Sequence, residues 1–315
     1  MKNRNPEPPT GEQSGLSSSS LDPAPPRREP AAGASSSGRP NLVIAIVPVL
    51  LVLVTFLFWY QTWFGRRLSD AELGKYLSDT SKPRETQHAL SQLAEQMARG
   101  DPAVRQWYPR VVALSGNKES GLRVMAAWVM GQDNRSEEFH TALKPLLDDP
   151  DPMVRRNAAL ALVRFGDSSG RAELRAMLQP YPLTAPQAGK VIFRLKERDS
   201  VGPGSIVARI QVEGSPRIDV HSPLSGTVER RLVEDESAVR AGEQIAILAP
   251  GEGQVWECLR ALYFVGTEED LPDVERFVRQ PRPGPSADGW PTDIPDRIQQ
   301  QAALTAQAIR QRAQE

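Results

Sequence analysis

The sequence predicts a multidomain chain: a single transmembrane helix, an α-solenoid of helical pairs, and a small all-β unit that interrupts the solenoid. Three observations carry this prediction. One long uncharged apolar run lies near the N-terminus, similar helical segments recur along the chain, and a duplicated β-prone segment lies between two of these copies. Recurring helical pairs are typical of solenoids, whose neighbouring units stack to bury a continuous core.

Composition excludes two classes of protein. The 315 residues include 38 Lys and Arg against 39 Asp and Glu, so a general nucleic-acid binder, which needs a basic surplus, is not expected. Cys258 is the one cysteine, which rules out a disulfide framework within the chain. It sits in an apolar helical run, where we expect a small buried core residue rather than a reactive thiol.

The N-terminal part predicts a membrane anchor. Residues 1–40 are rich in Pro, Ser, Gly and Ala, and we expect a disordered tail. Residues 41–64 hold an uncharged run whose length suits one bilayer crossing, so we predict a transmembrane helix there. The expected anchor residues are Leu42 at its start and the aromatic side chains Trp59, Tyr60 and Trp63 at its end, the last three forming an interfacial belt. The lipid bilayer is thus an expected partner.

Helical periodicity then fills residues 65–183 and returns at 251–280. The segment LRVMAAWVMG at 122–131 matches VRRNAALALV at 154–163, and CLRALYFVG at 258–266 matches the downstream part of the same copy. Each copy is followed by a second short amphipathic helix. We therefore predict one solenoid that continues after the insertion. The remaining residues, 281–315, predict a linker and a C-terminal helix.

These copies resemble HEAT (armadillo-like) repeats, through the Asp-Pro turn, the VRRNAALAL helix and the Gly-Asp break at 166–167. The resemblance implies an extended surface that binds other proteins. It covers 115–180 and 252–280 clearly and 68–114 weakly.

Residues 184–250 predict a separate β domain with an internal duplication. The segment beginning at Ala185 matches the segment beginning at Ser222, with one extra residue in the second copy, which we assign to Ala238. Each copy predicts strand, turn, short strand, glycine turn and strand. The connections to the solenoid are predicted as a Pro-rich turn, YPLTAP, and a Gly-rich turn, APGEGQ. The predicted turn residues are Pro186, Gly189 and Gly204 in the first copy and Pro223, Gly226 and Gly242 in the second. Further matched pairs are Val191 with Val228, Leu195 with Leu232, and Glu197 with Glu234.

The duplicated segment resembles the biotinyl/lipoyl-like domain, a barrel-sandwich hybrid in which two small sheets face each other about a pseudo-two-fold axis. Carrier domains of that family attach a cofactor to a lysine in the hairpin between the halves. The resemblance places this position at Ser215, and the hairpin VEGSPRIDVHSP contains no lysine. The nearest lysines, Lys190 and Lys196, lie in predicted strands. We expect no bound cofactor.

The same half-motif is similar to that of membrane-fusion adaptors, which also begin with one transmembrane helix and lack the carrier lysine. Their long helical hairpin between the halves is absent here. Arginines flank both ends of the apolar run almost equally, so the charge rule does not orient it. The analogy implies a bacterial inner-membrane protein with its globular part in the periplasm.

No residues group into a recognisable catalytic or metal-binding motif. His88, His140 and His221 are far apart in sequence and lack metalloenzyme spacing. Trp107, Tyr108, Trp128 and Trp256 fall within helical apolar patterns, and we expect them to pack in the core.

The sequence therefore favours a non-enzymatic, membrane-anchored scaffold or adaptor, an accessory subunit of a membrane complex or export system. We expect protein partners, no nucleic acid and no metal. Two alternatives remain open: a biotin or lipoate carrier-like domain without its attachment lysine, and a regulatory subunit of a membrane enzyme.

Overall fold

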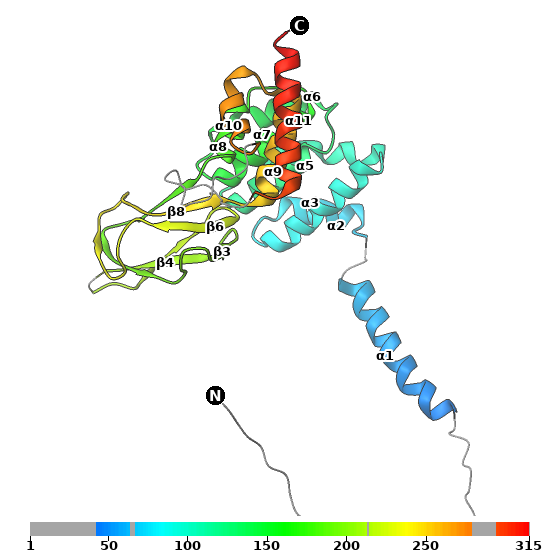
Figure 1. Cartoon of the computed structure of the whole chain (residues 1–315). Coiled ribbons are helices and arrows are strands. Elements are labelled where there is room, and N and C mark those ends of the chain that lie inside the picture. Colours follow the sequence, from blue (N-terminus) through cyan, green and yellow to red (C-terminus); the bar gives the residue numbers. More distant parts are fainter. Residues whose placement is uncertain (1–41, 64–66, 213, 279–293, 315) are drawn as a thin grey trace, which may run out of the picture. The chain divides into compact units, whose positions relative to one another are not determined.

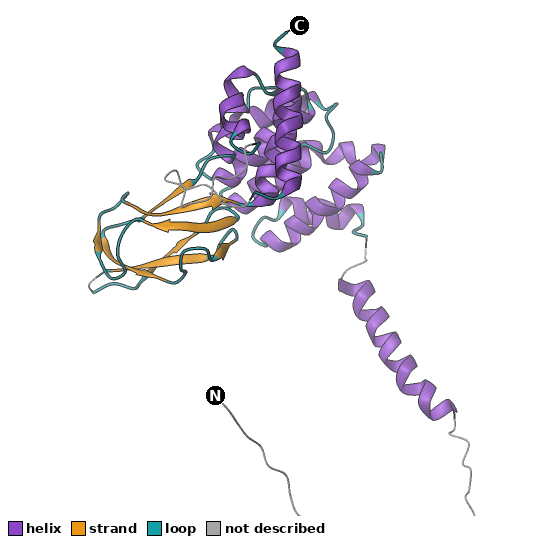
Figure 2. Cartoon of the chain, in the orientation of Figure 1, coloured by secondary structure: helices purple, strands orange, loops and turns teal. Residues whose placement is uncertain are grey.

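A computed structural model describes residues 42–63, 67–212, 214–278 and 294–314. Contacts divide the chain into two units, Met1–Arg66 and Arg67–Glu315, which are described separately. Figure 1 gives the order of elements, and Figure 2 separates the helices from the strands. The predicted tail at 1–40 and the linker residues 281–293 lie outside the described residues.

Helix α1 (Leu42–Trp63) is the element described in the first unit. Its side chains are described from Ile46 to Leu57, where the large apolar ones are between 47% and 67% exposed. Among the described residues, no helix combines the length and the hydropathy needed to cross a membrane.

The second unit contains a helical region and a β unit. The helices before the strands are α2 (Asp70–Ser78), α3 (Pro83–Ala98), α4 (Tyr108–Leu114), α5 (Ser120–Met130), α6 (Glu137–Leu143), α7 (Pro152–Arg164) and α8 (Arg171–Met177). After the strands come α9 (Glu252–Val265), α10 (Leu271–Glu275) and α11 (Asp296–Arg312). Three short 3-10 helices, η1 (Pro102–Trp107), η2 (Lys144–Asp148) and η3 (Glu268–Asp270), connect them.

The Asp-Pro turn fixes the start of α7. The side chain of Asp151 accepts a hydrogen bond from the backbone N–H of Met153 at 2.8 Å and caps the helix. Asp149, two residues before Asp151, receives two hydrogen bonds from the Arg123 guanidinium at 2.7 and 2.8 Å. This bidentate contact ties α5 to the turn that begins the next repeat.

Small residues allow α5 and α7 to pack closely. The alanine pairs predicted to be equivalent, Ala126–Ala127 and Ala158–Ala159, are fully buried. At Gly131, an added Cβ would lie 2.9 Å from the Cβ of Ala161, closer than such atoms normally approach. Bulkier side chains here would therefore push the helices apart.

Helix α9 packs directly against α7 and α8, although the whole β unit separates them in sequence. The buried Arg156 on α7 donates to the Gln254 side chain at 2.5 Å, and Gln254 donates to the Met177 carbonyl at 2.7 Å. The Cys258 thiol donates to the Leu174 carbonyl at 2.8 Å. The helical core thus runs through the insertion point without a break.

The β unit consists of two four-stranded antiparallel sheets. In chain order its strands are β1 (Tyr181–Thr184), β2 (Gly189–Phe193), β3 (Ser200–Val201), β4 (Ile206–Gln211), β5 (Ile218–His221), β6 (Gly226–Arg231), β7 (Ala238–Val239) and β8 (Gln244–Pro250). The sheets have the orders β1-β8-β6-β3 and β5-β4-β2-β7. We match β1 with β5, β2 with β6, β3 with β7 and β4 with β8. Exchanging each strand for its match converts the strand order of the first sheet into that of the second. Each sheet therefore contains two strands from each half, as a pseudo-two-fold exchange requires.

The hydrogen bonds repeat this symmetry. The Ala185 amide donates to the Glu243 carbonyl at 2.8 Å, and the equivalent Ser222 amide donates to Ser205 at 2.8 Å. A second equivalent pair follows the same pattern. The Glu236 amide donates to the Val191 carbonyl, and the Arg198 amide donates to the Val228 carbonyl. The internal duplication predicted from sequence is thus a structural repeat.

Two details of the predicted β unit are wrong. The YPLTAP segment is not a turn, because Tyr181–Thr184 forms strand β1 and pairs with β8. The extra residue of the second half is Glu229 rather than Ala238. The pairing of β6 with β8 shifts between Val228 and Arg230, whereas β2 pairs with β4 without interruption. A β-bulge, which opposes two residues to one, accommodates an extra residue inside a strand.

The relocated insertion corrects two of the matched pairs. Leu195, a partly buried residue packed on the core, is equivalent to the partly buried Val233 rather than to the exposed Leu232. Glu197 is equivalent to Asp235, because their carboxylates accept hydrogen bonds from equivalent amides, those of Arg231 and Phe193.

Candidate functional site

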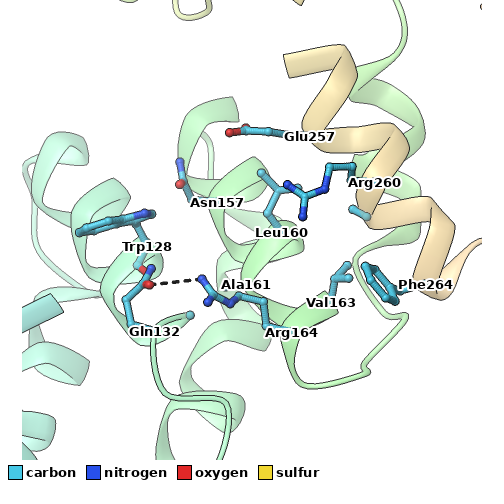
Figure 3. Close-up of a pocket in the computed structure, with 12 residues that line it drawn as sticks. Trp128, Gln132, Asn157, Leu160, Ala161, Val163, Arg164, Glu257, Arg260 and Phe264 are labelled. Atoms are coloured by element: carbon cyan, nitrogen blue, oxygen red, sulfur yellow. Dashed lines mark hydrogen bonds between the residues drawn. The ribbon is translucent and has the colours of Figure 1, made fainter. Parts of the chain in front are cut away.

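A groove crosses the same face of α5, α7 and α9, with a cavity volume of about 490 Å³. Five of its lining residues carry the argument that follows. They are the aromatic residues Trp128 and Phe264, the arginines Arg164 and Arg260, and Leu160 on the apolar floor. Figure 3 shows Trp128 and Phe264 at opposite ends, with Leu160 and the two arginines between them. The polar lining residues are Gln132, Asn157 and Glu257.

The lining residues occupy equivalent positions in successive helices. Trp128, Leu160 and Arg260 correspond under the offsets that align the repeats, and so do Gln132, Arg164 and Phe264. Residues spaced at these intervals lie at the same height on the same helix face. The groove is therefore a property of the repeat stack, and it exists because α9 continues the stack after the insertion.

The ends of the groove are apolar and exposed. Phe264 is 63% exposed and Trp128 is 43% exposed, whereas the floor residues Ala161 and Ala261 are buried. Sequence reasoning placed Trp128 in the core, and this was wrong. Exposed aromatic side chains beside a shallow apolar floor are typical anchor positions for a protein partner.

The charged residues of the groove are positioned by neutral contacts. Arg164 donates to the Gln132 side chain at 3.3 Å. The guanidinium carbon of Arg260 lies 4.6 Å from the centre of the Trp256 ring, a cation–π contact. Among the described residues, neither arginine forms an ion pair.

The predicted glycine positions of the β unit have a structural role and lie outside the groove. Gly204 and Gly242 have φ of 82° and 78°, which favours glycine. At Gly189 an added Cβ would lie 2.7 Å from the Gln211 carbonyl oxygen, and at Gly226 it would collide with that of Ala249. Pro186 and Pro223 lie in the equivalent turns before β2 and β6.

Ser215 lies exposed in the hairpin between β4 and β5, where its amide donates to the Val212 carbonyl at 3.3 Å. Lys190 is on β2, as predicted, and pairs with Glu236 at 3.0 Å. The prediction that Lys196 lies in a strand is wrong, because it lies in the turn after β2. Neither lysine belongs to this hairpin.

The histidines stay apart and contact other groups. His88 contacts Gln92, His140 contacts the Asp167 carboxylate at 2.7 Å, and His221 contacts the Gly204 carbonyl. The described residues contain no group of three or more potential metal ligands. Cys258 is fully buried, and burial raises the pKa of its thiol well above the ordinary value.

The remaining aromatic and anchor residues predicted from the sequence lie either in the core or among side chains that the structure does not describe. Trp107 and Tyr108 are buried, and burial together with the hydrogen bond to Asp133 raises the pKa of Tyr108. Leu42, Trp59, Tyr60 and Trp63 fall in the backbone range of α1, but their side chains lie outside the described ones.

Comparison with known proteins identifies the helical repeats. Residues 109–184 match the family model for HEAT repeats. This range contains α5 and α7, two of the three groove helices. A search of curated proteins gives no match. The HEAT repeats support a role in protein–protein binding.

Proposed function

We propose that this chain is a non-enzymatic, membrane-anchored scaffold or adaptor that binds a protein partner in the groove on α5, α7 and α9. The observation that carries the proposal is the pair of exposed aromatic residues, Trp128 and Phe264, at the two ends of a groove built by stacked repeats. HEAT repeats at 109–184 support it independently, because such repeats generally bind proteins. The partner is proposed to be another subunit of a membrane complex or export system.

The membrane anchor is supported by the sequence from Leu42 to Tyr60, which has no charged residue. Within α1, the large apolar side chains from Ile46 to Leu57 are exposed, and water is a poor environment for such a surface. A bilayer would cover it. We place the globular part in the periplasm of a bacterium, by analogy with single-span adaptors.

The β unit is proposed to be a biotinyl/lipoyl-like domain that contributes to recognition and does not carry a cofactor. Its two four-stranded sheets with symmetric strand orders support this identity. The absence of lysine from the hairpin around Ser215 favours recognition over a carrier function.

The groove proposal is tested by crosslinking and affinity capture from native membranes. Trp128→Asp combined with Phe264→Asp removes both anchors, and the main partner should be lost. Leu304→Asp is the matched control, because Leu304 is 54% exposed on α11 and does not line the groove. Retention of every partner by the double variant would overturn the proposed binding site.

The anchor is tested by carbonate extraction of membranes. The full chain should remain in the pellet, and a chain beginning at Arg67 should be soluble. Recovery of the full chain in the supernatant would exclude the anchor. For orientation, alkaline phosphatase fused after Gln280 should be active. An inactive phosphatase with a fluorescent GFP fusion at the same place would reverse the orientation.

A further inference from the structure

We infer that the groove selects an acidic protein segment that carries a bulky apolar side chain. The inference rests on the proposed function and adds the chemistry of the partner. Its basis is the contrast between the arginines in the groove and those that pair with carboxylates elsewhere in the same helical region.

Several arginines outside the groove pair with carboxylates. Arg155 pairs with Glu173 at 2.9 Å, and Arg123 contacts Asp149 at 2.7 Å. Between α8 and the region around α10, Arg171 pairs with Asp270 at 3.1 Å. These contacts join neighbouring helices, so their charges are used within the fold.

The two groove arginines lack such partners among the described residues. Arg164 uses one of its five N–H donors on the neutral Gln132 side chain, and Arg260 rests on the Trp256 ring. Both side chains are exposed. Each guanidinium group makes one of these contacts within the fold and retains donors for an incoming carboxylate. Arginine forms bidentate hydrogen bonds with carboxylates, which gives direction as well as affinity.

The space between the arginines is apolar. Leu160 and Val163 are partly buried in the floor, and Ala161 and Ala261 are buried below. Figure 3 shows the Arg164 and Arg260 side chains on either side of Leu160. A side chain such as Leu or Phe on the floor would bring flanking Asp or Glu residues within reach of both arginines. The floor favours a protein segment over a nucleic acid, whose phosphates would leave it exposed.

The balance of charge in the groove supports this choice. Glu257 is the single acidic lining residue against two arginines, although the whole chain has a net charge of −1. The groove therefore has a surplus of positive charge that the chain as a whole lacks. Local charge of this kind contributes to the choice of partner and to its rate of association.

The test uses the full chain in detergent micelles and two short fluorescent peptides. In one peptide Glu alternates with Leu and Phe, and in the other every Glu is replaced by Gln. The acidic peptide should bind at least about tenfold more tightly, ~1.4 kcal/mol, and lose that advantage in high salt. Arg164→Gln combined with Arg260→Gln should abolish the difference, whereas Arg194→Gln, on the exposed turn after β2, should leave it unchanged.

Each outcome separates the inference from the proposed function. Equal binding of both peptides, or an unchanged preference in the double arginine variant, overturns the inference. The groove proposal then still stands if Trp128→Asp with Phe264→Asp loses the native partner. Absence of binding to either peptide also overturns the inference. Arginine-dependent binding of a single-stranded oligonucleotide that exceeds peptide binding would reassign the groove to nucleic acid. A circular dichroism melt confirms that each variant folds.

Discussion

Phe193 and Arg231 occupy equivalent positions in the two halves of the β unit, and they contact each other. The guanidinium carbon of Arg231 lies 4.5 Å from the centre of the Phe193 ring. Their backbone amides donate to the equivalent carboxylates of Asp235 and Glu197, at 2.9 and 3.0 Å. Equivalent residues that touch must flank the pseudo-two-fold axis. The backbone of the duplicated unit is thus symmetric about this axis. The side chains at its centre are not, because an aromatic ring faces a guanidinium group.

Removing this central contact should loosen the β unit. Arg231→Ala removes the cation–π contact and the hydrogen bond to the Leu195 carbonyl, and we expect a loss of about 1–3 kcal/mol. Hydrogen exchange of the β2 and β6 amides should accelerate, while the amides of α5 and α7 stay protected. Arg230→Ala, at the exposed neighbouring position, is the control. Equal effects of the two variants would contradict a specific role for Arg231.

The close approach at Gly226 predicts a large effect of one methyl group. Gly226→Ala would place a Cβ against the Ala249 carbonyl oxygen, and the strands would have to separate. We expect a loss of about 3 kcal/mol or more in the free energy of unfolding of the β unit. Gly253→Ala is the control, because an added Cβ would meet no other segment of the protein within 4 Å, and alanine suits helix α9 better than glycine. Denaturant melts followed by strand hydrogen exchange compare the two.

Asp149 should make the stability of the helical region dependent on acidic pH. The hydrogen bonds from Arg123 hold the pKa of Asp149 below its ordinary value of 3.8, against the opposing effect of burial. A carboxyl with a depressed folded-state pKa stabilises the fold above its unfolded pKa. That contribution is lost as the pH falls below about 4 and through the folded-state pKa.

Asp149→Asn should therefore cost about 2–4 kcal/mol at neutral pH, because Arg123 loses its charged partner. The cost should shrink in acid, where the wild-type carboxyl is protonated as well. Thermal melts at several pH values measure this. Asp148→Asn, the exposed neighbour, should change little at any pH. A constant difference between wild type and Asp149→Asn down to strongly acidic pH would refute the linkage.

Gln254 should couple the two sides of the insertion. Gln254→Ala removes its bonds to Arg156 and to the Met177 carbonyl, leaving the buried guanidinium with fewer partners. We expect a loss of about 1–3 kcal/mol and faster hydrogen exchange at the start of α9. Glu257→Ala on the same helix is exposed and should have little effect on stability. If both variants melt like the wild type, the Arg156–Gln254 contact contributes nothing to the stability of the packing between α7 and α9.

The β unit should carry neither biotin nor lipoate. The hairpin around Ser215 contains no lysine, and Lys190 is engaged with Glu236 on the sheet. Intact-mass spectrometry of the chain from its native membranes should show no added mass for either cofactor. Modification of Lys190 or Lys196 would show that the attachment position was assigned to the wrong place.

The sequence predicted the helical repeats because their packing imposes a pattern on the chain. Close contact between neighbouring helices requires small residues at fixed positions, and the Ala126–Ala127 and Ala158–Ala159 pairs reveal the repeat directly. Glycines that fill special backbone positions, such as Gly204 and Gly242, likewise revealed the duplication of the β unit.

Other features depend on contacts that the pattern does not specify. A bulge at Glu229 leaves no residue signature, so sequence alignment placed the extra residue nearer to the next glycine. Trp128 has the helical spacing of a core residue, and only the stack of α5, α7 and α9 shows that it is exposed. The alignment of the repeats places the groove residues at equivalent positions. It does not show which of these positions face the solvent.

The pairing of β1 with β8 has a consequence for how the chain folds. Tyr181 lies beside Leu248, so the first and last strands of the β unit are neighbours. Once the β unit has formed, the two ends of residues 181–250 lie next to each other. Helix α9 can then reach α8 at the small entropic cost of closing a short loop rather than the larger cost of closing a long one. We therefore expect the β unit to form before the helical repeats on its two sides join, and a chain whose β unit is destabilised should join them slowly.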